Sequence, residues 1–257
     1  MLEADSAKAA LLKPKLPQLQ IQQVDVVTAL GNQYLLQNIS FEVFAGDRIG
    51  IIGTSGSGKT TLLRLLNRLS EPTSGHITFE QKPLSDWLIL SLRRQIMLVP
   101  SEPKLLGMTV QEALSYPLRL QKIPDQSLQT RILLWRQRLG IADEWLNSTE
   151  FQLSMSQRQL VSLTRACLSE PKICLLDEPT SALDPGTVER VAQVLVASSM
   201  TLLIASHQFE LLAKVCDRIL WLHQGQLYLD VPLTQINWSE IQAQLVAQAQ
   251  AEQAEWE

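Results

Sequence analysis

The chain has 257 residues, of which 46% are hydrophobic and 19% are charged, and its formal net charge at pH 7 is −4. This composition fits an ordinary globular protein with one sizeable core and, at most, a subdomain beside it. The acidic balance argues against a general nucleic-acid binder, which needs a basic face toward the phosphates, so we expect no nucleic-acid partner.

The cysteines and the apolar runs set the expected environment. Cys167, Cys174 and Cys216 form no CxxC pair, which argues against a disulfide framework or a structural zinc site and suits a reducing cytosol. The first residues, Met1 to Pro17, lack the apolar core of a signal peptide. No run reaches the roughly 18 uninterrupted apolar residues of a membrane span. We therefore expect a cytoplasmic protein that does not cross a membrane by itself.

The first part of the chain predicts short strands followed by a helix. Residues 1–17 are rich in Ala, Lys and Pro and predict a flexible segment. Between Leu19 and Phe44 the pattern alternates as in strands, with breaks at Gly31-Asn32 and Ala45-Gly46. A short apolar strand is expected over 48–52, and the leucine spacing predicts a buried helix over 60–69.

The rest of the chain predicts a helical insertion and then alternating helices and strands. Residues 84–152 have their own composition and predict a helical subdomain within a main domain over 18–232. After it we expect a helix over 156–169, a strand over 173–176, a helix after Pro185 and a strand over 201–205. This alternation predicts a parallel sheet with crossover helices. Residues 233–257 predict a helical tail.

A glycine-rich turn joins the strand over 48–52 to the following helix. It fits G-x-x-x-x-G-K-[ST] and consists of Gly53, Thr54, Ser55, Gly56, Ser57, Gly58, Lys59 and Thr60. Such a turn lets backbone N–H groups close around phosphates, and the helix adds its positive amino-terminal end. Lys59 is expected to reach the outer phosphates and Thr60 to ligate Mg²⁺, with Thr61 also near the nucleotide. The turn therefore predicts a nucleotide site.

Two carboxylates end the apolar strand over 173–176. That strand delivers Asp177 to the carboxyl edge of the sheet, where ligands bind in such folds. Asp177 is expected to hold Mg²⁺ and Glu178 to polarise an attacking water. The alternative is a strand that ends in a solvated acidic turn, but the phosphate-type turn earlier in the chain favours the functional interpretation.

From about Leu19 to Asp230, the chain resembles the nucleotide-binding subunit of ABC transporters. Five further segments carry the resemblance, in the expected order. They are the approach to a glutamine loop (Arg93 to Pro100), a signature-like segment (Leu153 to Gln159), a Walker B segment (Leu175 to Thr180), a D-loop (Ser181 to Asp184) and a switch histidine (Ala205 to His207).

The resemblance implies an α/β fold: a P-loop NTPase core with a mixed sheet, an N-terminal antiparallel β-subdomain and an inserted helical subdomain. It implies two ATPase subunits, identical or different, arranged head-to-tail around ATP and Mg²⁺. Each ATP would then lie between Lys59 of one copy and Ser154 of the other. His207 would contact the γ-phosphate, and Asp184 would touch the partner copy. The amides around Ser156 and Gln157 would open a further anion-binding helix.

The resemblance also implies a function and a location. ATP binding would close the dimer, and hydrolysis, with Glu178, His207 and Lys59 as catalytic residues, would reopen it and drive an integral membrane permease. The chain would then lie on the inner face of the cell membrane. Two alternatives remain open: a regulatory module that binds ATP but scarcely hydrolyses it, and a soluble ABC-type ATPase without a transport role. The transported substrate and the direction of transport are not determined by the sequence.

Three positions depart from the family pattern. The expected glutamine is Ser101, which is too short to reach the same position unless a water bridges. The two glycines of the signature are Met155 and Ser156. The place of the adenine-stacking aromatic holds Leu30, with Tyr34 nearby but offset. None of these changes touches the phosphate loop or the acidic pair, so we expect hydrolysis to be retained, at a reduced rate if these positions matter.

Two further sets of residues allow a structural or a functional interpretation. Residues 103–109 and 116–120 are candidates for the socket of a permease helix, with simple packing of the subdomain as the equal alternative. The tryptophans of this region are expected to pack its core rather than to contact a ligand; they are Trp87, Trp135 and Trp145.

Overall fold

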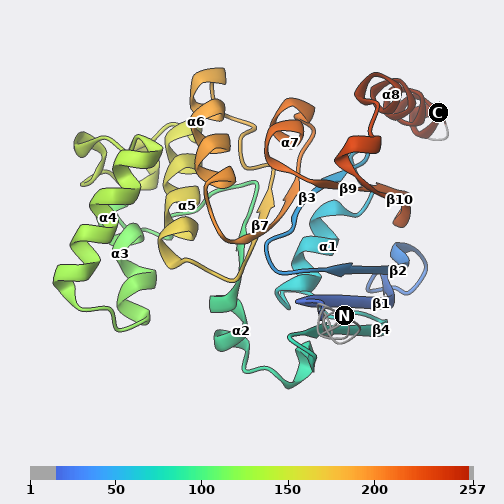
Figure 1. Cartoon of the computed structure of the whole chain (residues 1–257), viewed down its shortest axis with the longest axis horizontal. Coiled ribbons are helices and arrows are strands. Elements are labelled where there is room, and N and C mark those ends of the chain that lie inside the picture. Colours follow the sequence, from blue (N-terminus) through green and yellow to red (C-terminus); the bar gives the residue numbers. More distant parts are fainter. Residues whose placement is uncertain (1–15, 255–257) are drawn as a thin grey trace, which may run out of the picture.

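A six-stranded mixed sheet forms the centre of the protein in a computed structural model, which describes residues 16–254 (Figure 1). Its strand order is β10-β9-β3-β8-β7-β6. The strands are β3 (Arg48–Ile52), β6 (Ile96–Val99), β7 (Ile173–Asp177), β8 (Thr201–Ala205), β9 (Arg218–His223) and β10 (Gln226–Pro232). Neighbours from β9 to β6 run parallel, and β10 pairs antiparallel with β9. The mixed sheet predicted from the sequence is confirmed.

A second, antiparallel sheet lies beside it and has the order β2-β1-β4-β5. Its strands are β1 (Leu19–Val27), β2 (Tyr34–Val43), β4 (Ser74–Phe79) and β5 (Lys82–Pro83). In β1 the apolar Leu19 and Ile21 are buried, whereas Gln22 and Gln23 are exposed. One face therefore packs on the rest of the molecule, as is usual for an antiparallel sheet. This is the expected N-terminal β-subdomain.

Helices cover both faces of the larger sheet, and α3 and α4 form a separate group at the left of Figure 1. The α-helices are α1 (Lys59–Leu66), α2 (Ile89–Gln95), α3 (Val110–Leu120), α4 (Asp125–Leu139), α5 (Met155–Ser169), α6 (Pro185–Val196), α7 (Phe209–Val215) and α8 (Trp238–Ala254). Single 3₁₀ turns are η1 (Leu84–Asp86), η2 (Asp143–Trp145), η3 (Glu150–Gln152) and η4 (Leu233–Gln235).

The structure differs from the sequence prediction in two places. Strand β6 lies within the range 84–152 that predicts a helical subdomain, and it pairs with β7 at the edge of the central sheet. Helix α1 ends at Leu66, earlier than the predicted residue 69. The reason lies in Arg68, which has a φ of +55° and donates to the carbonyl groups of Leu84 and Trp87, so the chain turns away from the helix axis.

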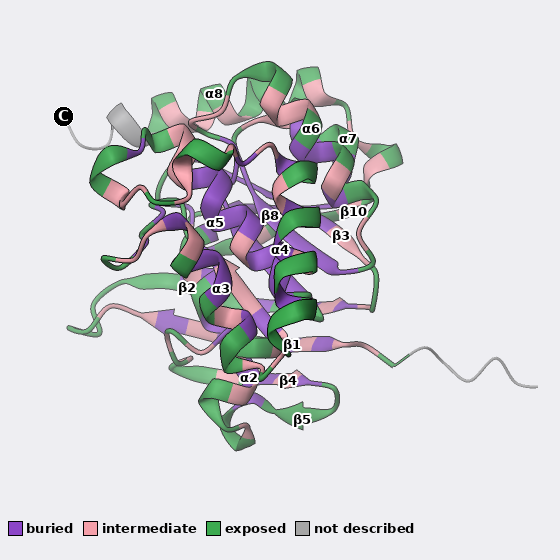
Figure 2. Ribbon diagram, turned by 90° about the vertical axis from the view of Figure 1, so that its left-hand side faces the viewer, coloured by how far each residue is buried: buried purple, intermediate pink, exposed green. Residues whose placement is uncertain are grey.

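Two hydrophobic clusters occupy the two faces of the central sheet. In Figure 2 the buried residues are concentrated in the interior, where the strands of this sheet run. Successive residues of β7 point to opposite faces of the sheet. Cys174 and Leu176 belong to the first cluster, which includes residues of α3 to α8. Ile173 and Leu175 belong to the second cluster, which includes residues of α1 and the β-subdomain.

Trp135 belongs to the first cluster and Trp145 packs against it, as expected for the core of the helical subdomain. Trp87 differs from that expectation: it packs on the second cluster, 5.3 Å from the ring of Phe79 in the β-subdomain.

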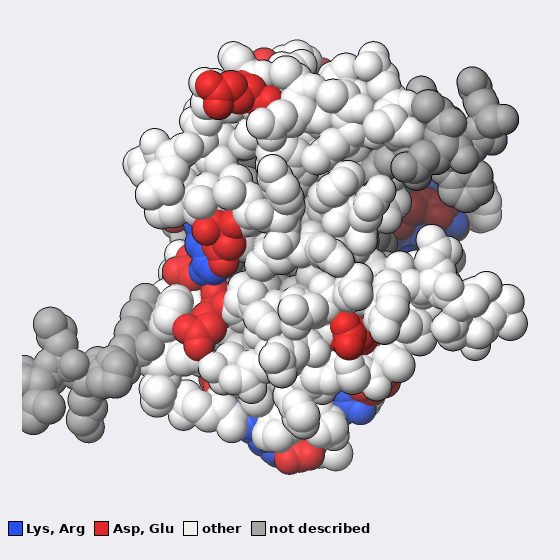
Figure 3. All heavy atoms as spheres, turned by 90° about the vertical axis from the view of Figure 1, so that its right-hand side faces the viewer, with Lys and Arg blue, Asp and Glu red and all other residues white. Residues whose placement is uncertain are grey.

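The remaining expectations concern the surface charge, membrane-spanning helices and the first residues of the chain. On the face seen in Figure 3, charged side chains form small separate groups among uncharged ones. None of the described helices is both long enough and apolar enough to cross a bilayer. The flexible segment predicted for residues 1–17 lies, for residues 1–15, outside the described part of the chain.

Candidate functional site

The glycine-rich turn follows β3 at the carboxyl edge of the central sheet and leads into α1. Lys59 is only 8% exposed, because its side chain folds over the turn. Its Nζ donates to the carbonyl oxygens of Gly53, at 2.9 Å, and Thr54, at 2.8 Å. The ammonium group is therefore placed at the centre of the loop, with backbone groups around it.

Two glycines make this turn possible. Gly53 has a φ of 151°, and a Cβ there would lie 2.2 Å from the carbonyl oxygen of Leu222. Gly58 has a φ of 104°, and a Cβ there would lie 2.9 Å from the carbonyl oxygen of Leu35. Side chains are thus excluded at both positions. The Oγ of Ser57 is buried and has no hydrogen-bond partner among the described residues, so a polar group inside the turn is left to meet a ligand.

The acidic strand end meets this turn directly. Asp177 is the last residue of β7 and is 4% exposed. The hydroxyl of Thr60 donates to its Oδ2 at 2.9 Å. A hydroxyl and a carboxylate side by side are the hard oxygen ligands that Mg²⁺ prefers, so these residues fit the predicted metal. The structure brings together the two residues that the sequence assigned to Mg²⁺.

Glu178 stands next to this pair in an unusual backbone conformation, with a φ of 47°. Its amide donates to the carbonyl oxygen of Ala205 at 2.8 Å. Its carboxylate accepts hydrogen bonds from the amide of His207, at 3.1 Å, and from the Oγ of Ser206, at 3.3 Å. The alternative of a solvated acidic turn does not describe Glu178, because its side chain is only 20% exposed.

His207 faces the carboxylate of Glu178, with its Nε2 3.6 Å from Oε1. Burial lowers the pKa of His207 below its ordinary value, and the positive charge of Lys59 lowers it further, while Glu178 opposes the shift. The imidazole is therefore neutral near pH 7, and the contact is not an ion pair. A neutral ring retains one nitrogen that donates and one that accepts.

The signature-like segment forms the amino-terminal end of α5. Ser154 is its N-cap: its Oγ accepts from the amide of Gln157 at 3.2 Å, and its own amide donates to Oε1 of Gln157 at 2.8 Å. This reciprocal capping box accounts for why the helix begins here. Met155 is 42% exposed and Ser156 is half-buried, so both replacements of the family's glycines present side chains at the helix end.

The remaining positions named from the family resemblance are the D-loop aspartate, the glutamine-loop position and the position of the adenine-stacking aromatic. Asp184 caps α6 by accepting from the amide of Thr187 at 3.0 Å, and its contact with a partner copy stays a prediction. Ser101 is exposed just after β6. Leu30 is 87% exposed and Tyr34 is 51% exposed, so both are open to a ligand.

Sequence reasoning missed two residues of this site as individuals. Ser206 donates to the carboxylate of Glu178, and Gln159 donates to its carbonyl oxygen at 2.7 Å. Both lie inside segments that the family resemblance had singled out, which is the signal that could have pointed to them. Both are also buried polar side chains, and such groups require partners.

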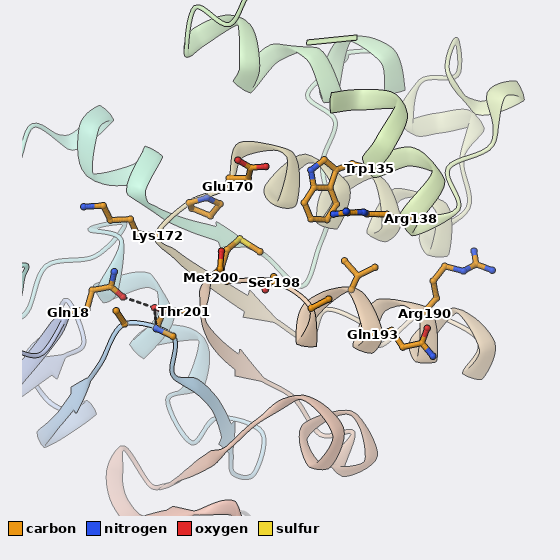
Figure 4. Close-up of a pocket in the computed structure, with 16 residues that line it drawn as sticks. Gln18, Trp135, Arg138, Glu170, Lys172, Arg190, Gln193, Ser198, Met200 and Thr201 are labelled. Atoms are coloured by element: carbon orange, nitrogen blue, oxygen red, sulfur yellow. Dashed lines mark hydrogen bonds between the residues drawn. The ribbon is translucent and has the colours of Figure 1, made fainter. Parts of the chain in front are cut away.

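A large cavity of about 710 Å³ lies elsewhere, at the amino ends of β7 and β8 (Figure 4). Trp135, Arg138, Lys172 and Arg190 are among the residues that line it. Lys172 immediately precedes β7, whereas Asp177 ends that strand. The cavity is therefore at the opposite end of the strands from the phosphate-type turn and is not the predicted site.

Comparison with known proteins agrees with this geometry. The sequence model described as ABC transporter matches residues 36–181. A methionine import ATP-binding protein of Listeria monocytogenes is 34% identical over 200 residues, which cover 75% of this chain and 59% of that protein. A glutamine transport ATP-binding protein of Geobacillus stearothermophilus is 34% identical over 209 residues, which cover 79% and 86%. The chain thus spans only part of the length of the methionine import proteins.

Solved structures give the same result. A dimeric ATP-binding cassette in a post-hydrolysis state, bound to ADP and Pi, superposes with a TM-score of 0.78 at 26% identity and covers 84% of this chain and 98% of that one. A subunit from Clostridium perfringens, part of the ABC transporter complex cbiONQ, superposes with a TM-score of 0.74 at 26% identity, over 90% and 92%. With the glycine-rich turn, the acidic strand end and the capped signature-like helix in place, the chain belongs to the ABC transporter family.

Proposed function

We propose that the chain binds ATP at the turn around Lys59 and hydrolyses it to ADP and phosphate. One observation carries the proposal: the hydroxyl of Thr60, in the glycine-rich turn, donates a hydrogen bond to the carboxylate of Asp177 at the end of β7. A glycine-rich turn alone, or an acidic strand end alone, is compatible with a protein that binds no nucleotide. Their contact favours a site for a triphosphate with its metal, because it unites phosphate donors and metal ligands.

In this proposal Thr60 and Asp177 hold Mg²⁺, which supplies positive charge against the phosphate oxygens. Lys59 contributes a further positive charge at the outer phosphates. The amides from Gly53 to Thr61 close around the remaining oxygens at the positive end of α1.

Glu178 serves as the base. Its carboxylate is held by the amide of His207 and the hydroxyl of Ser206, so its direction is fixed before a substrate arrives. His207 is neutral near pH 7 and can therefore both donate to a phosphate oxygen and accept from a water. The protein's part of the chemistry is to orient the water and to receive its proton at Glu178.

We further propose that two ATPase subunits pair head-to-tail, so that the helix end at Ser154 completes the site of the partner. The capping box of Ser154 uses the hydroxyl oxygen as an acceptor and leaves its hydrogen able to donate to an anion. The similar cassette solved as a dimer supports this arrangement.

The function proposed for the assembly is ATP-driven transport through a separate membrane permease, with the chain on the inner face of the membrane. The names of the relatives, methionine import and glutamine transport, favour an importer. In the two candidate docking segments, Leu106 is 77% exposed and Tyr116 is 52% exposed, whereas Leu105 is 1% exposed. We assign the exposed side chains to the permease and the buried one to packing of the subdomain.

The test is steady-state ATP hydrolysis by the purified chain, with and without Mg²⁺, for the wild type and Glu178→Gln. We expect magnesium-dependent turnover that falls by roughly 10²- to 10⁴-fold in the variant, as for loss of a general base. An exposed carboxylate on η2 provides a matched control, and Glu144→Gln should retain the wild-type rate. Equal background rates in the wild type and Glu178→Gln would support a regulatory ATP-binding module in place of an ATPase.

The transport role needs a separate measurement. The tagged chain is purified from detergent-solubilised membranes, and the co-purifying proteins are identified. An integral membrane protein with several spans is the expected partner, and Leu106→Glu should reduce its recovery. Recovery of soluble proteins alone would contradict the transporter and favour a soluble ABC-type ATPase.

A further inference from the structure

Gln159 of α5 is a buried side chain that joins two parts of the site. It is 2% exposed, and its Nε2 donates to the carbonyl oxygen of Glu178 at 2.7 Å and to the Oγ of Ser181 at 3.3 Å. Its Oε1 accepts from the amide of Ala182 at 3.0 Å. The nitrogen and the oxygen of the Gln159 side-chain amide therefore both form hydrogen bonds to the segment that follows β7.

The bond to Glu178 matters because of the backbone there. A φ of 47° is uncommon for a residue with a side chain and persists only where the surroundings hold it. The amide of Glu178 donates to the carbonyl oxygen of Ala205 at 2.8 Å. Its own carbonyl oxygen accepts from Gln159 at 2.7 Å and, within the same turn, from the Oγ of Ser181 at 3.2 Å. Gln159 supplies the shortest of the bonds to this carbonyl oxygen and the bond that comes from helix α5, so it helps to hold the backbone that directs the carboxylate toward His207.

Gln159 also belongs to the first turns of the helix that Ser154 caps. A rigid helix therefore links the anion-binding end at Ser154 to the backbone of Glu178 and Ala182. In the head-to-tail pair proposed above, Ser154 and Glu178 of one chain serve different ATP molecules. A shift of α5 when Ser154 meets the partner's nucleotide would reach Glu178 through Gln159, directly and by way of Ser181.

We infer that Gln159 is a positioning residue, which holds the backbone of Glu178 for hydrolysis and couples it to the neighbouring ATP site through α5. The inference rests on the proposed function, since it assigns Glu178 the role of base. The competing possibility is a purely structural role, in which the amide only fills and satisfies a buried space between α5 and the D-loop.

Two substitutions separate the positioning role from the structural one. Gln159→Glu keeps the size of the side chain and the acceptor for Ala182 but removes the donor to Glu178. Gln159→Leu removes donor and acceptor together. Gln121→Leu is the matched control, because Gln121 donates to the carbonyl oxygen of Ser169 at 3.2 Å, at the other end of the same helix.

The measurements are turnover, ATP dependence of the rate, nucleotide affinity and thermal unfolding of the full chain. For both Gln159 variants we expect turnover to fall by roughly ten- to a hundredfold, as for misplacement of a catalytic group, with nucleotide affinity within about twofold of wild type. The Hill coefficient for ATP, measured for wild type and Gln159→Glu, should fall toward one in the variant. The control should keep wild-type turnover.

Each outcome has a distinct meaning. Unchanged turnover and Hill coefficient in a folded Gln159→Glu protein overturn the inference while leaving the proposed function intact. If turnover in both Gln159 variants falls only as much as the fraction of folded protein falls, Gln159 has a purely structural role. That result also overturns the inference. An inactive wild type contradicts the proposed function itself, and the inference falls with it.

Discussion

Thr60 and Asp177 are separated by 117 positions in the chain, yet the hydroxyl of one donates to the carboxylate of the other at 2.9 Å. The glycine-rich turn and the acidic strand end can each be recognised in the sequence, but only the fold places them in one site. The parallel order of β3, β8 and β7 brings their carboxyl ends to the same edge. Substitutions at this edge should therefore affect metal binding, nucleotide binding and turnover in different ways.

The first prediction concerns the metal. Asp177→Asn weakens the carboxylate's hold on Mg²⁺, because a neutral amide oxygen is a poorer ligand for a hard cation. Mg²⁺ should strengthen ATP binding to the wild type and have little effect on ATP binding to the variant. Titration calorimetry with and without Mg²⁺ measures this difference. Asp143→Asn, on the exposed η2 turn, should behave as wild type; an equal loss there would contradict a specific role for Asp177.

The second prediction concerns Lys59. Lys59→Ala removes the ammonium that folds over Gly53 and Thr54 and should raise the Kd for Mg-ATP by at least about tenfold, which corresponds to about 1.4 kcal/mol. Fluorescent nucleotide binding measures the change. Lys214→Ala removes a surface partner of Glu189 and is the control. If a folded Lys59→Ala protein binds Mg-ATP as tightly as wild type, the site is elsewhere.

The third prediction follows from the lowered pKa of His207, whose ordinary value is 6.5. Below that pH the unfolded chain binds a proton that the native histidine does not yet bind. The contribution of His207 to stability is therefore fully present above pH 6.5 and is lost as the pH falls through the lower, folded-state pKa. Thermal unfolding between about pH 5 and 7 should show a shallower acid loss for His207→Asn. An unchanged slope in a folded His207→Asn protein would refute the assignment.

The fourth prediction concerns Ser101, where the family has a glutamine. Ser101 is exposed after β6, and its side chain is shorter than the glutamine of the family pattern. Ser101→Gln should raise magnesium-dependent turnover several-fold by supplying an amide for the attacking water. Ser101→Ala should match wild type. A lower rate in Ser101→Gln would mean that this site is adapted to the shorter residue.

The fold and the centre of the site could be predicted because their signals are local. Lys59 and Asp177 lie in short segments where strand, turn and helix follow directly from residue type. Gln159 could not be assigned a role, since its partners lie in a segment that reaches α5 only in the folded chain. The edge strand β6 was hidden for a similar reason: its four residues sit among helices, and only pairing with β7 defines them as a strand.

The alternation of β7, with Cys174 toward one cluster and Leu175 toward the other, means that both clusters share the same strands. Cutting away the β-subdomain would expose the cluster around Leu175, and cutting away α3 and α4 would expose the apolar side of α5 on which they pack. Calorimetry of the intact chain should therefore give a single cooperative transition, and excised fragments should aggregate before they fold. The protein is better treated as one indivisible folding unit than as a core with detachable parts.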